Sequence, residues 1–282
     1  AGEHRCRRVP PVGDDVVAVT APLTFTVDTG ERPVSGSTEP GGRITQHEGR
    51  WDVVDVPIGN GRDLGETDLD REGFRLVESP SAVENFYDED ELRRVYYPEI
   101  EALIARLTGA ARVVVFDHTL RHGDEAAQVQ RHLREPVRIA HNDYTDWSGP
   151  QRVRDLYPDD ADQMLQSRMA VIQAWRPITG PVLRDPLAIC DAQSLAQKDL
   201  IPVERRHAER VGEIYHVARS PAQRWFYVPE MTRDEVLIFK CYDSLRDGRA
   251  RFTAHGSFEH PDTPASAPPR ESIEIRTFAF FD

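Results

Sequence analysis

Pairs of histidine and aspartate separated by one residue are the part of this sequence best suited to chemistry. The chain contains three such pairs, at His122/Asp124, His141/Asp143 and His260/Asp262. Because a β-strand turns residues i and i+2 to the same side, a pair of this kind can offer one imidazole nitrogen and one carboxylate oxygen to a single metal ion. The pattern also arises by chance, so the surrounding sequence has to decide which pair forms a site.

The surroundings favour His141 and Asp143. These residues directly follow the apolar run Val137–Ala140, and a later histidine, His255, ends another predicted strand. The third pair of the chain lies in a proline-rich loop with no histidine after it. The first pair lies in a polar stretch that is more typical of a solvated turn, and we keep this pair as the alternative metal site. We therefore expect His141, Asp143 and His255 to form a metal site.

An arginine and a serine follow the third predicted ligand. Arg270 and Ser272 open the last predicted strand and, being two residues apart, face the same way. Two imidazoles and one carboxylate on one face of an iron ion leave positions open, which is what an Fe(II) oxygenase needs. An arginine fork beside a hydroxyl suits the far carboxylate of a dicarboxylate cosubstrate. Arg276 lies on the same strand face and is the alternative to Arg270 for this role.

The elements that must position these residues are mostly short strands. A helix is predicted over Asp88–Leu107, where apolar residues recur at helical spacing and Gly109 follows. A second helix is predicted over Ala161–Trp175, before Pro177. After residue 181, short apolar runs separated by Pro, Asp and Gly turns indicate a sandwich or barrel. The predicted strands are Arg112–Phe116, Val137–Ala140, Leu187–Cys190, Glu213–Val217, Trp225–Val228, Glu235–Tyr242, Arg251–His255 and Glu271–Phe281.

Charge and cysteine usage exclude several classes of function. Lys and Arg number 35 against 48 Asp and Glu, so the formal net charge is −13. That charge argues against nucleic acid or an anionic membrane surface as a partner, and no apolar run approaches the roughly 18 residues of a membrane span. The three cysteines, Cys6, Cys190 and Cys241, are far apart, which indicates no disulfide scaffold and favours a cytoplasmic location. Glycine-rich nucleotide loops are absent from the sequence, which argues against dinucleotide-binding and P-loop proteins.

Several longer stretches, taken together, resemble a known family. They are Phe74-Arg-Leu-Val77, Tyr97-Pro-Glu99, Val115-Phe-Asp-His-Thr119, Ala140-His-Asn-Asp-Tyr-Thr145, Trp175-Arg-Pro-Ile178, Phe239-Lys-Cys-Tyr-Asp-Ser244, Ala254-His-Gly-Ser-Phe258 and Pro269-Arg-Glu-Ser-Ile-Glu-Ile-Arg276. In them the chain is similar to the fungal and actinobacterial hydroxylase/desaturase family, which includes the cephamycin 7-hydroxylase component and gibberellin desaturase-like proteins. The resemblance spans residues 72–281.

The resemblance implies a fold and a cofactor set. The fold would be mainly β with flanking helices, a double-stranded β-helix of the jelly-roll or cupin-like kind. The enzyme would use Fe(II), 2-oxoglutarate and O2, with His141, Asp143 and His255 as iron ligands. Arg270, together with Ser272, would hold the C5 carboxylate of 2-oxoglutarate.

The same resemblance implies a reaction class and an organisation of the chain. The substrate would be a small secondary-metabolite intermediate that is hydroxylated, desaturated or oxidatively cyclised, with succinate and CO2 as coproducts. We expect one oxygenase domain over residues 1–282. Within it, residues 71–282 would form the jelly-roll core with its supporting helices. Residues 1–70 match the family poorly and would form a variable, β-rich segment that could serve an interface in a homo-oligomer.

Three further residues are predicted to line the substrate pocket, namely Tyr144, Trp175 and Arg176. Two other interpretations of the sequence stay open. In the first, His141, Asp143 and His255 bind zinc in a hydrolase that uses a bound water as nucleophile. In the second, the chain is a non-catalytic β-sandwich binding module, and the two histidines are ordinary strand-end residues.

Overall fold

Residues 17–36, 46–131, 133–206 and 210–282 are described by a computed structural model, in which the strands form two sheets. The smaller sheet has the order β5-β13-β8-β15-β6. Its strands are β5 (Phe74–Glu78), β6 (Arg112–His122), β8 (Met169–Pro177), β13 (Glu235–Asp243) and β15 (Glu271–Phe280).

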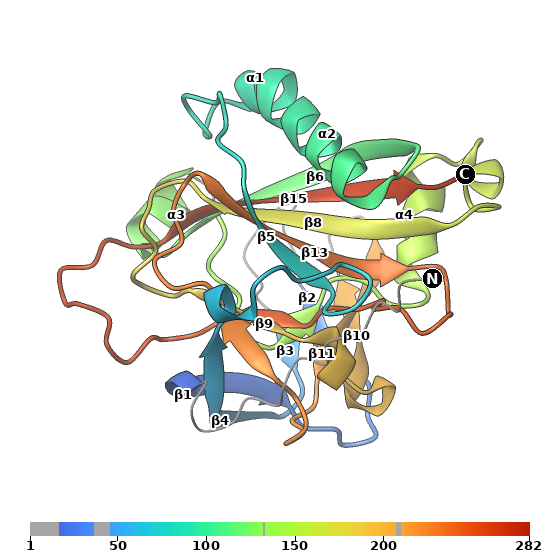
Figure 1. Ribbon diagram of the computed structural model, residues 1–282. Coiled ribbons are helices and arrows are strands. Elements are labelled where there is room, and N and C mark those ends of the chain that lie inside the picture. The colour runs from blue at the N-terminus through green and yellow to red at the C-terminus, as the bar shows by residue number, and fades with distance from the viewer. Residues whose placement is uncertain (1–16, 37–45, 132, 207–209) are drawn as a thin grey trace, which may run out of the picture.

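The larger sheet has the order β1-β4-β12-β9-β14-β7-β11-β10-β2-β3. Its strands are β1 (Val17–Thr26), β2 (Val34–Gly36), β3 (Gln46–Glu48), β4 (Trp51–Asn60), β7 (His141–Asn142), β9 (Leu187–Cys190), β10 (Leu200–Arg206), β11 (Val211–Val217), β12 (Trp225–Tyr227) and β14 (His255–Ser257). Figure 1 shows this sheet below the smaller one, with β1 and β4 at its far edge. The mainly β architecture confirms the predicted fold class.

Helices flank the sheets and are short except for one. They are α1 (Glu89–Glu91), α2 (Tyr97–Thr108), α3 (Glu125–Arg131), α4 (Ser148–Leu156) and α5 (Ala161–Met164), with a π-turn η3 (Leu92–Tyr96) and 3-10 turns η2 (Gly61–Leu64), η4 (Ala192–Ser194) and η5 (Gln197–Asp199). The predicted helix over Asp88–Leu107 is confirmed as α1, η3 and α2 in succession. It begins where the Asp88 carboxylate accepts a hydrogen bond from the Glu91 amide, and ends at Gly109, whose φ of 71° suits glycine.

The smaller sheet is buried on both faces, and strand β15 shows how. Ile273 and Ile275 face outward and pack with Leu103 and Ile104 of α2, which lies across this sheet in Figure 1. The alternate side chains of β15 face the other sheet, and Phe278 joins the core between the two sheets. Because the strand period is two, the polar residues Ser272, Glu274 and Arg276 are carried to that inner side as well.

The predicted helix over Ala161–Trp175 is wrong. Only α5 (Ala161–Met164) is helical, and residues 169–175 belong to β8. Every residue of β8 is buried, with Val171 facing the inner core and Ile172 facing α2. A strand that is buried on both faces shows no alternation of apolar and polar residues, so periodicity alone cannot separate it from a buried helix.

Other predicted strands are shifted or longer. The strand predicted over Arg112–Phe116 continues to His122, and that predicted over Arg251–His255 is found at His255–Ser257. Of Val137–Ala140, only Ile139 makes an isolated bridge, and the short strand β7 lies just beyond it. The cysteines Cys190 and Cys241 are buried and free, whereas Cys6 lies outside the described residues. In the part of the chain that is described, no helix has the length and hydropathy needed to span a bilayer.

Candidate active site

Three predicted ligands meet between the two sheets. His141 lies in β7 and His255 begins β14, and the two residues are register partners in neighbouring antiparallel strands. Their ring centroids are 4.4 Å apart, and His141 Nε2 lies 3.4 Å from Asp143 Oδ1. One potential ligand atom from each of His141, Asp143 and His255 lies within 4.8 Å of the others. They form the only cluster of three or more potential metal ligands among the described residues.

Backbone carbonyls orient both imidazoles. The Nδ1 of His141 is 2.7 Å from the Ile139 carbonyl oxygen, and the Nδ1 of His255 is 3.1 Å from that of Thr253. Because a carbonyl oxygen can only accept, each Nδ1 must carry the proton and donate it. The Nε2 atoms are then unprotonated and available to a metal, which is the arrangement typical of histidine ligands.

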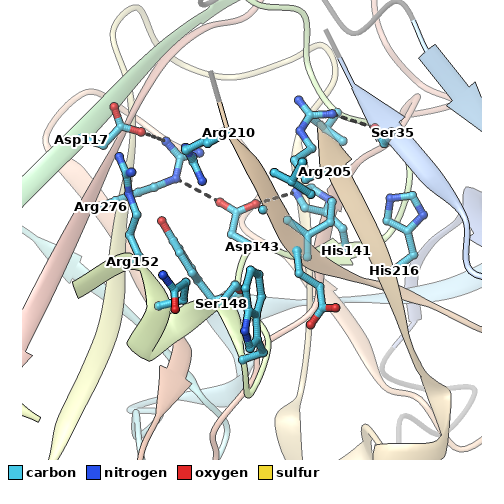
Figure 2. Close-up of a pocket in the computed structure, with 18 of the residues that line it drawn as sticks. Ser35, Asp117, His141, Asp143, Ser148, Arg152, Arg205, Arg210, His216 and Arg276 are labelled. Carbon is cyan, nitrogen blue, oxygen red and sulfur yellow. Dashed lines mark hydrogen bonds and ion pairs between the residues drawn. The ribbon is translucent and has the colours of Figure 1, made fainter. Parts of the chain in front are cut away.

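The carboxylate of Asp143 is held through one oxygen. Its Oδ2 accepts hydrogen bonds from Gln173 Nε2 in β8 and from Arg276 Nε in β15, the latter at 3.2 Å. Its Oδ1 remains on the side of His141. The smaller sheet therefore fixes the rotation of a ligand that the larger sheet supplies, and Figure 2 shows Asp143 between Arg276 and His141.

The charge states of Asp143 and His255 suit a divalent cation. Burial would raise the pKa of Asp143, but the Arg276 guanidinium and His141 hold it well below its usual range, so the group is a carboxylate. Burial, reinforced by the neighbouring His141, lowers the pKa of His255 to about 4, so its imidazole is neutral near pH 7. A neutral imidazole and an ionised carboxylate are the forms that bind metals.

A small cavity borders the two imidazoles and Arg270. It is lined by Arg121, Val137, His141, Trp175, Leu187, His255, Ser257, Arg270 and Glu274. The Arg270 guanidinium lies 5.4 Å from the Trp175 ring, and its Nη1 donates to the Asp185 carbonyl at 2.6 Å. Its Nε and the hydroxyls of Ser257 and Ser272 are buried and have no hydrogen-bond partner. Buried polar atoms without partners are rare in native proteins, so these three indicate a bound polar group.

The alternative arginine, Arg276, forms hydrogen bonds with several side chains around it. Besides Asp143, its guanidinium donates to Asp117 Oδ2 at 3.1 Å, to Thr119 Oγ1 at 2.9 Å and to Glu274. These contacts hold the guanidinium on the inner face of the smaller sheet, against a predicted metal ligand. Arg270, which directly precedes β15, and Arg276, which lies within it, therefore line different cavities beside His141.

A larger, open pocket adjoins His141 and shares Arg121, Val137 and His141 with the smaller cavity. Its walls include His141 and Asp143 on one side and helix α4 with the end of β10 on the others. Tyr144, predicted to line the substrate pocket, lies in this wall, whereas Trp175 lies in the wall of the smaller cavity. Figure 2 shows Arg152, Arg205 and Arg276 around Asp143 in the open pocket.

Arg176 lies outside the group that the structure brings together. Its side chain faces the helix side of β8, where its Nε donates to the Tyr96 hydroxyl at 2.9 Å and its Nη2 to the Ser79 carbonyl at 2.6 Å. The strand period explains this position, because neighbouring Trp175 faces inward. The two other His-x-Asp pairs also lie elsewhere: Asp124 accepts from an amide of α3, and His260 contacts the Tyr227 hydroxyl.

Several site residues escaped prediction from the sequence. Gln173 was missed because the sequence was wrongly interpreted as a helix over Ala161–Trp175, so its side chain was not expected to face the site. Glu274 could have been found, because it lies between Ser272 and Arg276 on the same face of a correctly predicted strand. Arg121 pairs with Glu274 through Nε at 3.1 Å and Nη2 at 2.9 Å. No motif near Arg121 in the sequence indicates that it belongs to the site.

Three comparisons with known proteins agree that the chain is similar to oxidoreductases. A sequence profile described as "Oxidoreductase/YMDC permease-like domain" matches residues 23–280. The Fe(II)/2-oxoglutarate-dependent dioxygenase nvfI of Aspergillus novofumigatus is 35% identical over 220 residues, covering 76% of this chain and 78% of its own. The hydroxylase/desaturase efuI of Hormonema carpetanum is 34% identical over 241 residues, covering 77% and 80%. A solved structure of the iron and alpha-ketoglutarate-dependent endoperoxidase NvfI superimposes with a TM-score of 0.82 at 31% identity, covering 93% of this chain and 98% of that one.

Proposed function

Because this chain belongs to the Fe(II)/2-oxoglutarate-dependent oxygenases of the hydroxylase/desaturase family, we propose that His141, Asp143 and His255 are its iron ligands. The chain is a non-haem iron dioxygenase with a jelly-roll fold that uses Fe(II), 2-oxoglutarate and O2. Its three clustered side chains fit iron, because two free Nε2 atoms and one carboxylate oxygen form the two-histidine, one-carboxylate set of such enzymes. Family membership favours the oxygenase over the zinc hydrolase and the binding module.

One observation carries the cosubstrate assignment, namely the unpartnered polar atoms around the small cavity. We propose that Arg270, Ser272 and Ser257 bind the C5 carboxylate of 2-oxoglutarate, while the other end of the molecule faces the imidazoles. Burial and the nearby Arg121 lower the pKa of Arg270 to about 10. A bound carboxylate offsets both effects and satisfies the atoms that now lack partners.

When bound, iron and 2-oxoglutarate supply the oxidising chemistry, with succinate and CO2 as coproducts. The residues of the chain hold and shield these groups. Gln173 and Arg276 fix the Asp143 carboxylate, and the two backbone carbonyls fix the imidazoles. Trp175 and Leu187 give the cosubstrate cavity apolar walls, which exclude water.

The substrate is a small molecule, as in the hydroxylase/desaturases and dioxygenases that the chain resembles. We propose that it is a secondary-metabolite intermediate that enters the open pocket beside His141, where it is hydroxylated, desaturated or oxidatively cyclised. We also propose that the chain acts as one oxygenase domain, because the larger sheet supplies the ligands and the smaller sheet supplies Arg270 and Arg276. A cytoplasmic location fits an enzyme that must keep Fe(II) and two buried thiols reduced.

Anaerobic titration of the purified protein with Fe(II) and then 2-oxoglutarate tests this function. We expect a visible charge-transfer band when the keto acid chelates the iron. The band should be absent from the His141→Ala variant. The matched control is His260→Ala, which removes a histidine that lies outside the cluster. Iron that is bound without such a band in the wild-type protein would contradict the oxygenase and favour the zinc-type hydrolase.

A further inference from the structure

Arginines dominate the open pocket. Six of them line it, namely Arg121, Arg134, Arg152, Arg205, Arg210 and Arg276, against the four carboxylates Asp117, Asp143, Asp155 and Glu213. The excess of positive charge is local, because the whole chain has a formal net charge of −13. A bound Fe(II) would add two further positive charges beside Asp143. The pocket is therefore an anion-attracting region of an acidic protein.

Two of the six arginines already have carboxylate partners. Arg121 pairs with Glu274, and Arg276 pairs with Asp143 and Asp117. The other four, at positions 134, 152, 205 and 210, form no ion pair with a carboxylate of the described residues. Arg205 donates from Nη1 to the Ser35 hydroxyl at 2.7 Å, and the Nε of Arg152 is buried without a hydrogen-bond partner.

These four arginines also repel one another. Burial, followed by the positive charge of Arg134, lowers the pKa of Arg205 to about 10. Burial, followed by the charge of Arg152, lowers the pKa of Arg210. Asp143 opposes the first of these shifts and Asp155 the second, but six arginines still face four carboxylates in the pocket. Like charges that are partly desolvated are unfavourable unless something balances them. An anion in the pocket would provide that balance.

Arg152 and Arg205 approach the pocket from different elements. Arg152 comes from α4 and Arg205 from β10, and Figure 2 shows them on opposite sides of Asp143. Arg205 lines this pocket together with His141. Both are positioned to reach a molecule that lies against the predicted iron ligands. The aromatic side chains of Tyr144 and Trp147 line the same pocket, and Trp147 is 49% exposed, so an apolar surface is available next to the charges.

We propose that the substrate is an organic acid, whose carboxylate is bound by Arg152 and Arg205 while its carbon skeleton lies against Tyr144 and Trp147. The proposal rests on the proposed function, since it names the substrate class of that same site. It assigns the two arginines a role in substrate specificity, separate from Arg270 and its role toward the cosubstrate. A neutral substrate would leave six arginines facing four carboxylates among the described lining residues.

Paired acids and amides test the proposal on the anaerobic enzyme loaded with Fe(II) and 2-oxoglutarate. The probes are benzoate and benzamide, 2-naphthoate and 2-naphthamide, and decanoate and decanamide, and binding is measured by calorimetry. A charge-assisted hydrogen bond corresponds to about a tenfold or greater gain in affinity. We expect at least one acid to bind about tenfold more tightly than its amide. Arg152→Gln or Arg205→Gln should reduce this preference, and the double variant should abolish it.

Two neighbouring arginines provide matched controls. Arg154 is exposed on the same helix as Arg152 and does not line the pocket, and Arg206 follows Arg205 in β10 and pairs with Glu204. The Arg154→Gln and Arg206→Gln variants should keep the full preference. The inference is overturned if no acid binds more tightly than its amide, including the case in which none binds, or if the preference survives in the double variant.

The spectrum of the same samples separates this inference from the proposed function. The charge-transfer band should form in the wild-type protein and in the Arg152→Gln/Arg205→Gln variant alike. If the double variant loses the band, these arginines hold 2-oxoglutarate and the inference is overturned. If the wild-type protein forms no band, the proposed function itself fails, whatever the acids do.

Discussion

Replacing Arg270 is the change that best separates the two candidate arginines. Arg270 is 4% exposed, and its Nη1 is held by the Asp185 carbonyl. Its Nε has no partner, and the unpartnered hydroxyls of Ser257 and Ser272 are buried as well. Arg270→Gln removes the charge and the fork while keeping a polar side chain, so the cavity retains an amide that can still donate one hydrogen bond.

The expected loss follows from the burial of this site. Truncating one partner of a buried, hydrogen-bonded charge pair costs about 3 to 5 kcal/mol. At 1.4 kcal/mol for each factor of ten, the dissociation constant of 2-oxoglutarate should rise by about 100- to 4000-fold. Arg270→Lys keeps the charge without the planar fork, and we expect an intermediate loss.

The assay is an anaerobic titration of 2-oxoglutarate into the Fe(II)-loaded protein, followed by the charge-transfer band. Arg276→Gln is the comparison, because Arg276 contacts Asp143 and should change the affinity for iron more than the affinity for 2-oxoglutarate. Thermal unfolding of each variant shows whether the fold is kept. The reasoning is refuted if Arg270→Gln changes the 2-oxoglutarate affinity by less than about threefold in a folded protein, or if Arg276→Gln causes the larger loss.

Three further predictions concern the support of the site. Gln173→Leu removes the hydrogen bond to Asp143 Oδ2 and should weaken iron binding by about 10- to 100-fold, measured by metal titration; an unchanged iron affinity would contradict this support. Burial would raise the pKa of Glu274, but Arg121 and Arg276 lower this pKa from 4.5 to about 2. The ionised Glu274 side chain should therefore contribute about 3 kcal/mol to the free energy of unfolding. This contribution is present above pH 4.5 and is lost as the pH falls to 2. Urea unfolding at several pH values should show that Glu274→Gln flattens this acid dependence, and an equally steep dependence in the variant would count against it. Leu103→Ala, in the face of α2 that packs on the smaller sheet, should lower the free energy of unfolding by about 2 to 5 kcal/mol, with the half-buried Leu107→Ala as the milder control; equal losses in the two variants would show that this face is not the buried one.

The sequence was most informative where local rules decide the structure. The helix that begins after Asp88 and ends at Gly109 has a capping residue, an apolar stripe and a terminal glycine, and each is a signal within a few residues. The spacing of His141 and Asp143 could be interpreted in the same way. The parity of the last strand predicted that Ser272 and Arg276 share a face, which the register of β15 agrees with. Arg270, predicted on the same face, directly precedes the strand.

Prediction from the sequence failed where strands that are distant along the chain determine the surroundings of a residue. The run from Met169 to Pro177 is buried between α2 and the larger sheet, so it has no polar face that could reveal a strand. Its Gln173 reaches Asp143 only because β8 lies beside β15 and β13. The arginines of the open pocket come from elements as far apart as Arg152 and Arg205. No spacing along the chain predicts that such residues meet.

The most direct test of the account is a crystal structure of the protein loaded anaerobically with Fe(II) and 2-oxoglutarate. The account predicts an anomalous scattering peak at the iron edge between the imidazoles of His141 and His255 and the Asp143 carboxylate. It also predicts the distal carboxylate of 2-oxoglutarate beside Arg270 and Ser272. A metal bound elsewhere, or a 2-oxoglutarate carboxylate bound by Arg152 and Arg205, would contradict it.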